Sequence, residues 1–539
     1  MNTNILHSLS FTLLSLMPLN MNAQNPYLPM WEYIPDGEPY VFADPDNPGK
    51  KRVYIYGSHD TLIDGYCGRE LVAWSASTDS LSRWRYDGII LEVRQNAKGE
   101  YLDSEHRSDV FYAPDIVEKT ESDGRKMYYL YPNDQCGGRN GMVAASERPD
   151  GPFRVINWSE TNDMETVGDL GFDPAVFIDD DGRVYGYWGF EEPCVAELDP
   201  TTMATVKTGT EVRRNYINGY KKEGVFRFFE ASSIRKIKDK YVLVYSRFTG
   251  EGEFGLPSSN YTLAYAYSNS PMGPFVYGGT IIDGRGRGLD EHSRPIPTAT
   301  PDGNTHGSIC EINGRWWVFY HRQTGLDEYS RQAMVAPITV EVTEGKDGMV
   351  RISEGEYTSE GFMTDGLNPF RRHSAGIACY YTATKPAVHK WPRNTFYGSY
   401  VKPMRLKESP LGDVYRLDVN HNPVVNNTDG SVVGYKYFNL SVTNGVDNLC
   451  MSMTVVPEGI DGTIDIYVDS PHLSCGGKKV GSLPIRRTMP RKRQTLTAPI
   501  PGIRDMSGKH ALFFVIKSDV KGKSVCEIHD FAMTVIPGK

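Results

Sequence analysis

Residues 171–189 read GFDPAVFIDDDGRVYGYWG. Two apolar and aromatic runs, at 174–178 and 184–188, flank a segment rich in Asp and Gly. This pattern is typical of a β-hairpin, in which turn-forming residues join two strands. The stretch therefore predicts two antiparallel strands, with Asp173 just ahead of the first.

An aromatic strand of this kind recurs five times in the first two thirds of the chain, with starts separated by 74, 57, 57 and 75 residues. Several copies follow an apolar run and a turn, as in SICEINGRWWVFY at 308–320. Each copy therefore predicts the second strand of a hairpin. The five runs are VYIYG (53–57), MYYLY (127–131), VYGYW (184–188), YVLVY (241–245) and WWVFY (316–320).

These units predict a β-propeller. Outer-strand segments follow some of the hairpins, such as SERPDGPFRV at 146–155 and SNSPMGPFVY at 268–277. Four strands per unit suit propeller blades, in which radial repetition leaves only short, protected sheet edges. The expected fold is all-β, with a five-bladed β-propeller over residues 24–365. A large sandwich or a β-helix fits this spacing less well.

The repeat ends near residue 365. The segment GFMTDGLNPFRRHS at 361–374 is the expected linker, and strand-like runs such as TIDIYVDS at 463–470 and ALFFVIKSD at 511–519 follow it. Alternating strands and turns of this length predict one jelly-roll-like β-sandwich over residues 366–539.

Composition excludes some classes of protein. The chain has 539 residues, with 58 Lys and Arg against 67 Asp and Glu, so its net charge of -9 disfavours a dedicated nucleic-acid binder. The eight Cys show no zinc-like spacing, so we expect mostly buried free thiols.

The N-terminus indicates export. The apolar run at 9–19 is too short to span a bilayer, and small residues precede Gln24. Residues 1–23 are therefore the expected signal peptide of a periplasmic or extracellular protein. No Cys follows the run, so no membrane anchor is expected.

Acidic residues recur where the hairpins begin. The innermost strand of each propeller blade runs along a central axis, so residues at its start should converge on one cavity. Acids crowded together raise one another's pKa, which costs stability unless chemistry uses them. The converging residues are Asp36, Asp115, Asp173, Glu230 and His306.

Paired carboxyl groups with aromatic surroundings suit glycoside hydrolysis, in which one acid protonates the leaving oxygen and another acts on water or on the sugar. A calcium cage is the alternative use of such acids. The Asp-rich segments 44–49 and 179–182 resemble calcium loops superficially, but each lies where a hairpin turn is expected.

Together these segments resemble glycoside hydrolase family 43. The resemblance implies a five-bladed propeller that hydrolyses glycosides with inversion, with Asp36 as general base, Asp173 as the carboxylate that tunes and orients the acid, and Glu230 as general acid. The matching pieces are PDGEPYVF, VYIYGSHD, APDI, GFDPAVFIDDDGRVYGYWG, FFEASSIRKIKDKYVLVYS and THGSICEINGRWWVFYH.

The resemblance also implies supporting roles. His306 corresponds to a histidine that lines the sugar cavity and in many members helps to hold calcium, so a calcium ion is the expected cofactor. Asp115 and Arg331 are candidate sugar contacts. For the base, a direct alignment of the first and third hairpins places Glu38 opposite Asp173, so Glu38 is the alternative to Asp36. Asp44 is expected to be a turn residue.

Inversion requires room for a water molecule, so the carboxyl groups of Asp36 and Glu230 should lie about 6.5–9.5 Å apart.

The second domain resembles a family 6 carbohydrate-binding module, although RHSAGIAC at 372–379 lacks the paired acids usual at its start. Tyr380, Tyr381, Trp391 and Tyr435 could stack on sugar rings or, alternatively, pack in the core or between domains.

The resemblance therefore implies an inverting exo-glycosidase that releases terminal α-L-arabinofuranose or β-D-xylose from plant polysaccharides or their oligosaccharides. A β-D-galactofuranosidase or other furanosidase on the same scaffold stays open, as does a non-catalytic glycan-binding protein. A retaining fructosidase is disfavoured, because neither an NDPNG start nor an RDP triplet occurs.

Overall fold

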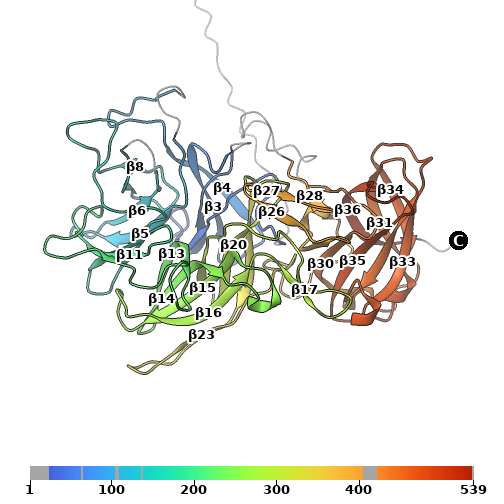
Figure 1. Ribbon diagram of the computed structural model, residues 1–539. Helices are drawn as coiled ribbons and strands as arrows, with labels where there is room; N and C mark the ends of the chain where they lie inside the picture. Colours follow the sequence, from blue (N-terminus) through green and yellow to red (C-terminus); the bar gives the residue numbers. More distant parts are fainter. Residues whose placement is uncertain (1–23, 62–64, 104–108, 135–137, 405–421, 537–539) are drawn as a thin grey trace, which may run out of the picture.

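The computed structural model describes residues 24–61, 65–103, 109–134, 138–404 and 422–536. The predicted signal peptide lies outside these residues. Strands make up almost all of the regular structure (Figure 1), so the all-β prediction is confirmed. The helices in the described residues are short 3₁₀ turns: η1 (Glu253–Gly255), η2 (Ala375–Ile377), η4 (Leu440–Thr443), η5 (Leu473–Cys475) and η6 (Pro501–Ile503).

Five antiparallel sheets follow one another in the first two thirds of the chain, and in each the strands pair in chain order. The predicted aromatic runs form their second strands. The first sheet contains β1 (Glu38–Ala43), β2 (Lys51–Tyr56), β3 (Glu70–Ser77) and β4 (Trp84–Glu92), and the second contains β5 (Asp115–Thr120), β6 (Lys126–Tyr131), β7 (Ala144–Ser146) and β8 (Arg154–Val155). The third sheet contains β9 (Ala175–Ile178), β10 (Val184–Trp188), β11 (Cys194–Leu198) and β12 (Arg213–Arg214), and the fourth contains β13 (Phe228–Ile237), β14 (Lys240–Thr249), β15 (Ser259–Ser268) and β16 (Val276–Asp283). The fifth sheet contains β19 (Ser308–Ile312), β20 (Arg315–Gln323) and β21 (Arg331–Ile338).

Burial on both faces explains why the second strands are apolar and aromatic throughout. Every residue of β10 is buried, because neighbouring sheets cover both of its faces. Gly186 lies in the middle of this strand, and a Cβ there would come within 2.5 Å of the Leu170 side chain and 3.1 Å of Leu198. The glycine therefore permits this close packing.

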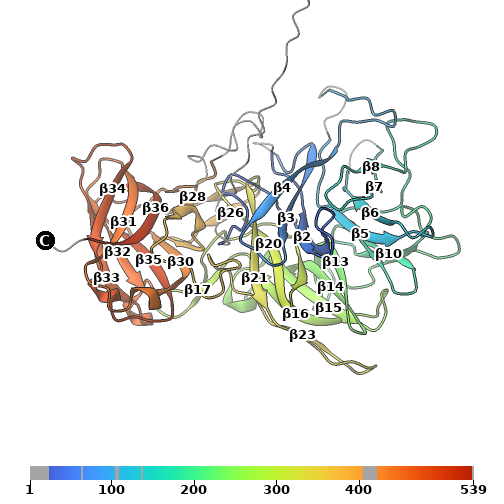
Figure 2. The ribbon, with the colours of Figure 1, turned by 180° about the vertical axis from the view of Figure 1, so that it is seen from behind.

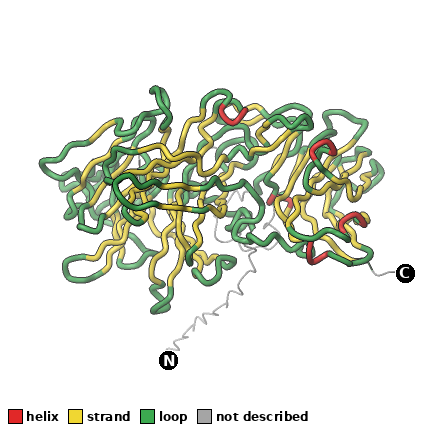
Figure 3. The backbone as a smooth tube through the Cα atoms, turned by 90° about the horizontal axis from the view of Figure 1, so that it is seen from below, coloured by secondary structure: helices red, strands yellow, loops and turns green. Residues whose placement is uncertain are grey.

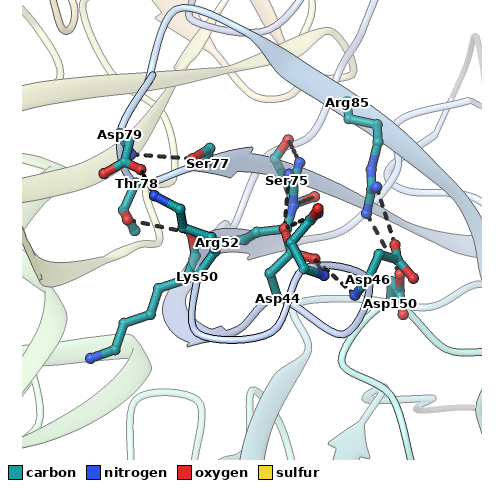
Figure 4. Close-up of polar contacts among 12 residues, drawn as sticks. Asp44, Asp46, Lys50, Arg52, Ser75, Ser77, Thr78, Asp79, Arg85 and Asp150 are labelled. Atoms are coloured by element: carbon teal, nitrogen blue, oxygen red, sulfur yellow. Dashed lines mark hydrogen bonds and ion pairs between the residues drawn. The ribbon is translucent and has the colours of Figure 1, made fainter.

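The Asp-rich loops are hairpin turns, as predicted. Between β1 and β2, Oδ1 of Asp44 accepts hydrogen bonds from the backbone N–H groups of Asp46 (2.9 Å) and Asn47 (3.2 Å), and its other oxygen lies 3.6 Å from Arg52 (Figure 4). An Asp side chain that bonds its own backbone two residues on stabilises a turn. Asp44 is therefore a turn residue.

The first strands of the five sheets lie next to one another. Asp115 at the start of β5 accepts a hydrogen bond from the Tyr40 hydroxyl of β1 (2.8 Å) and another from the backbone N–H of Val176 in β9 (2.7 Å). Strand β13 contacts β9, and a hydrogen bond of 2.7 Å joins Ser233 of β13 to Ser308 of β19. Strand β19 in turn contacts β1, so the starts of distant hairpins are brought together.

Two larger antiparallel sheets occupy the C-terminal part, at one side of the molecule (Figures 1 and 2). One contains β24 (His373–Ser374), β28 (Tyr400–Val401), β29 (Val424–Val425), β31 (Leu449–Pro457), β34 (Gln494–Pro499) and β36 (Cys526–Val535). The other contains β25 (Tyr380–Thr382), β30 (Val432–Asn439), β32 (Gly462–Val468), β33 (Lys478–Ile485) and β35 (Lys509–Lys517). Short hairpins complete the fold: β17 (Arg287–Leu289) with β18 (Pro295–Pro297), β22 (Val340–Val342) with β23 (Val350–Ile352), and β26 (Val388–Lys390) with β27 (Arg393–Thr395).

One hydrophobic core joins the two parts of the molecule. It runs without interruption from Leu263 and Val318 in the fourth and fifth sheets to Tyr435, Phe514 and Phe531 in the C-terminal sheets. The tube view shows the strands of both parts in one continuous body (Figure 3). The C-terminal part is therefore packed against the first part rather than tethered to it.

The segment ahead of β1 runs along the last sheet. The Asn25 amide donates to the backbone oxygens of Val335 (2.7 Å) and Thr358 (3.0 Å) and accepts from the N–H of Val335 (3.0 Å). The Tyr27 ring packs against Trp84 of the first sheet and Phe319 of the fifth. This segment therefore connects the first and last of the five sheets.

The seven cysteines within the described ranges are free thiols, and six of them are buried, as expected. No helix in the same ranges has the length and apolar character needed to cross a bilayer.

Candidate active site

Asp36, Asp173 and Glu230 line a single cavity of about 630 Å³. Asp36 lies two residues before β1, Asp173 lies two residues before β9, and Glu230 is the third residue of β13. All three are buried, with exposed fractions of 4–6%. The contacts between first strands explain how residues almost 200 positions apart in sequence share this space.

The backbone at these acids is unusual. Asp36 has a φ of 59°, Asp173 has a φ of 48°, and Ala231, next to Glu230, has a φ of 66°. Left-handed conformations are uncommon for residues other than glycine and often occur at functional sites, where the surrounding structure stabilises them. Here they occur at or beside each of the three acids.

Asp36 is held in its ionised form. Nη1 of Arg331 donates to both of its oxygens, at 3.0 and 3.1 Å, and the Ser58 hydroxyl donates to Oδ2 at 2.6 Å. Burial alone would raise the pKa of Asp36, but the charge of Arg331 and the contact with His321 outweigh it and hold the pKa well below its ordinary value. Asp36 is therefore an anion at neutral pH, as a general base must be.

Asp60 and His321 fix this arrangement. Asp60 accepts from Nε of Arg331 at 3.0 Å and from Nη2 at 2.8 Å. His321 accepts a hydrogen bond from the backbone N–H of Asp36 (3.2 Å) through Nδ1, and its Nε2 lies 2.9 Å from the backbone oxygen of Asn304. Arg331, expected to contact sugar, thus orients Asp36, although it also lines the cavity.

Glu230 and Asp173 titrate together. Burial raises the pKa of Glu230 well above its usual value, and the nearby charge of Asp173 raises it further. Burial also raises the pKa of Asp173, to about 7. The Asn133 amide donates to Asp173 at 2.9 Å, and His306 lies 3.6 Å from its other oxygen. Because these contacts favour the anion at Asp173, the shared proton belongs on Glu230.

Glu38, the alternative base, lies in a different environment. Its Oε2 accepts from Arg235 at 2.9 Å and from Ser233 at 3.1 Å, and its Oε1 lies 3.7 Å from His306. It is 1% exposed and does not line the cavity. Glu38 is therefore engaged by a partly buried guanidinium, whereas Asp36 faces the space in which a substrate would lie.

Asp115 and His306 differ from the expected sugar contacts. Both oxygens of Asp115 are bonded within the protein, to Tyr40 and Val176, so it connects strands and does not line the cavity. His306 lies between Glu38 and Asp173 and is also absent from the cavity wall. Burial lowers the pKa of His306, but its close approach to Glu38 and the other neighbouring carboxylates raise it to about 9.

These residues do not form a good calcium site. Both nitrogens of His306 face carboxylates, and the group on the far side of Glu38 is the positive side chain of Arg235. In the parts of the chain that the structure describes, no three His, Cys, Asp or Glu side chains gather as metal ligands. The surroundings of His306 therefore fit a protonated imidazole better than a calcium ion, which prefers several oxygen ligands.

The expected aromatic residues of the C-terminal part separate into two groups. Tyr380, Tyr381 and Tyr435 are buried, with exposed fractions of 0–6%, and belong to hydrophobic cores. Trp391 is 69% exposed and lines the cavity that holds the three acids. The other aromatic side chains of the cavity wall are Tyr66, Tyr112, Phe172, Phe190, Phe229 and Phe248.

Sequence reasoning did not identify the residues that support Asp36 and Asp173. Ser58, Asp60 and His321 lie in the motifs VYIYGSHD and WWVFYH, just after the aromatic runs, so their position was a usable signal. Asn133 follows the aromatic strand β6 in the same way. The ends of the second strands therefore supply the partners of acids that stand at the starts of the first strands.

Comparisons with known proteins identify relatives of this chain. The chain is 31% identical over 515 residues to "Xylosidase/arabinosidase" of Thermoclostridium stercorarium, a match that covers 92% of this chain and 96% of that protein. It is 25% identical over 550 residues to "Arabinoxylan arabinofuranohydrolase" of Paenibacillus polymyxa, covering 95% and 77% of the two chains. The family model described as "Glycosyl hydrolases family 43" matches residues 42–345, more than half of the chain. The chain therefore belongs to glycosyl hydrolase family 43 and is a glycoside hydrolase.

Proposed function

We propose that the protein is an inverting exo-glycosidase that releases terminal pentose, α-L-arabinofuranose or β-D-xylose, from plant polysaccharides or their oligosaccharides. The names of its relatives, xylosidase/arabinosidase and arabinoxylan arabinofuranohydrolase, support this substrate class. The observation that carries the mechanism is the contrast between two carboxyl groups in one cavity: Arg331 donates to Asp36 and lowers its pKa, whereas burial and the charge of Asp173 raise the pKa of Glu230.

In the proposed reaction a water molecule attacks the anomeric carbon on the face opposite the leaving group. Asp36 takes a proton from this water, while Glu230 gives its proton to the glycosidic oxygen as the bond to the anomeric carbon breaks. Asp173 keeps Glu230 protonated until substrate binds. The carboxyl groups of Asp36 and Glu230 are accordingly expected to be about 6.5–9.5 Å apart, which leaves room for the water.

The proposed architecture places this chemistry on the axis of a five-bladed propeller. The five successive sheets would be its blades, and the ring of contacts between β1, β5, β9, β13 and β19 supports this arrangement. The two C-terminal sheets would form a β-sandwich like that of a carbohydrate-binding module, from about residue 366 onward. Export of the protein, with residues 1–23 as signal peptide, would place it where plant polysaccharides are met.

The test uses the full-length protein with nitrophenyl α-L-arabinofuranoside, β-D-xyloside and β-D-galactofuranoside, and with the matching oligosaccharides. We expect pentose release, and NMR of the first-formed sugar should show the inverted anomer. Release of galactofuranose alone would favour the alternative furanosidase, and no release from any substrate would favour a glycan-binding protein. Retention of the anomeric configuration would contradict the mechanism.

Three variants assign the roles. Asp36→Asn should lower kcat about 10³-fold or more on every substrate, because no other base can replace it. Glu230→Gln should affect natural oligosaccharides far more than nitrophenyl glycosides, whose leaving group needs little protonation. Glu38→Gln is the matched comparison for the base. If it abolished activity while Asp36→Asn retained it, the base would be Glu38.

A further inference from the structure

A hairpin of the C-terminal part reaches the cavity that holds the three acids. Strands β26 and β27 pair from Val388 to Thr395, and Trp391 and Pro392 form the tip between Lys390 and Arg393. His389 and Trp391 both line the cavity. The cavity wall is thus built by two parts of the chain that the sequence suggested were separate domains.

The hairpin is fixed against the loop that joins β20 to β21. The backbone N–H of Asn394 donates to the oxygen of Leu326 at 2.8 Å, and Asp327 forms a β-bridge with Arg393. Nε2 of His389 lies 3.1 Å from Oε1 of Glu328. These contacts hold the hairpin in one place, so the position of its tip is part of the folded structure.

Glu328 connects this contact to the cavity wall. Its other oxygen accepts a hydrogen bond from the Tyr66 hydroxyl, and the Tyr66 ring lies under the guanidinium of Arg331, 4.9 Å from its central carbon. Arg331 in turn holds Asp36. A continuous series of contacts therefore runs from the hairpin to the proposed base.

Trp391, at the tip of the hairpin, is largely exposed. Its exposed fraction is 69%, against 5% for Asp36 and 6% for Glu230 in the same cavity. The acids therefore lie at the closed end and the indole at the mouth. An indole that is both rigidly placed and exposed offers a flat apolar face to a ligand.

We propose that Trp391 binds the leaving group of the substrate by stacking on the pyranose ring next to the scissile bond. This inference rests on the proposed function: if the terminal pentose occupies the closed end beside Glu230, the next sugar must lie toward the mouth. The hairpin would then select sugar chains as leaving groups, and the C-terminal part would act in substrate recognition at the active site itself.

The test compares two substrates that carry the same terminal pentose. In an oligosaccharide, xylobiose or arabinosylated xylotriose, the leaving group is a sugar. In the corresponding pentosyl fluoride it is a single atom that cannot reach Trp391. Trp391→Ala should lower kcat/KM about tenfold for the oligosaccharide, mostly through KM, and leave kcat/KM for the fluoride within about twofold.

Two further variants keep the result interpretable. Trp391→Phe retains a flat ring and should restore most of the activity on the oligosaccharide, even if Trp391→Ala is poorly folded. Tyr397→Ala removes another exposed aromatic ring of the same part of the chain, one that does not line the cavity, and should leave both substrates unaffected.

The inference would be overturned if Trp391→Ala lowered activity equally on both substrates or lowered neither. The proposed function fails in a different way, because the wild-type protein would then release no pentose from the oligosaccharide or from the fluoride.

Discussion

At the scale of single residues, chemically similar groups in one cavity have pKa values shifted in opposite directions. Asp36 and Glu230 are both buried carboxyl groups, and burial raises the pKa of each. What distinguishes them is the charge that acts most strongly on each, which is Arg331 for Asp36 and Asp173 for Glu230. The acid limb and the basic limb of the pH profile of kcat/KM should therefore respond to different substitutions.

Substitution of Arg331 should move the acid limb. The guanidinium lowers the pKa of Asp36, so its removal in Arg331→Met should raise that pKa. Asp36 must be ionised to act, so the acid limb of kcat/KM should shift to higher pH, by about one unit or more. Arg331→Lys, which keeps the charge, is the control and should shift less. An identical acid limb in wild type and Arg331→Met would contradict this role.

Substitution of Asp173 should move the basic limb instead. Its negative charge raises the pKa of Glu230, so Asp173→Asn should lower that pKa. Glu230 must be protonated to act, and the basic limb of kcat/KM should therefore shift to lower pH. The measurement is a pH profile on an unactivated oligosaccharide. A basic limb that stayed in place, or moved upward, would assign it to another group.

At the scale of elements, local pattern was a good guide. The turn and the two strands of each hairpin are close in sequence, so alternation and turn chemistry predict them, and β10 spans the predicted residues 184–188. Short hairpins such as β17 with β18 and β26 with β27 carry too few residues for a pattern. Their position depends on distant partners, and for this reason the location of Trp391 could not be predicted.

The difference between local pattern and distant contacts also explains which site residues the sequence could predict. Asp36, Asp173 and Glu230 occupy equivalent positions in a repeat, so the repeat itself brought them together. Ser58 and Asn133 support Asp36 and Asp173 through contacts across 22 and 40 positions, which no local pattern records. Asp115 shares the repeat position of the acids but bonds within the protein, so position alone does not determine function.

The segment before β1 should contribute measurably to stability. Asn25 is fully buried, and both ends of its amide bond the backbone of the last sheet. Asn25→Ala leaves these buried groups unsatisfied and should lower the free energy of unfolding by about 1–3 kcal/mol. Denaturant unfolding measures this, with the exposed Asn444→Ala as control. Equal stability of both variants would show that the segment is dispensable.

At the scale of the whole molecule, the boundary near residue 365 is a change of sheet pattern and not a break in the core. A chain truncated after residue 365 would expose the apolar side chains of the fourth and fifth sheets that now share one core with Tyr435 and Phe514. We expect the truncated protein to be insoluble, or to have a Tm at least about 10 °C below that of the full chain, because a loss of unfolding free energy lowers Tm. Thermal unfolding checks this, and an unchanged Tm would show an independent module.

The uninterrupted core also bears on how such proteins can diversify. A module joined by a loose linker can be exchanged between genes without harm to its neighbour. Here an exchange would have to preserve the shared core between the two parts of the chain and the hairpin that faces the acids. The two parts are therefore expected to change together, through paired substitutions on either side of that core.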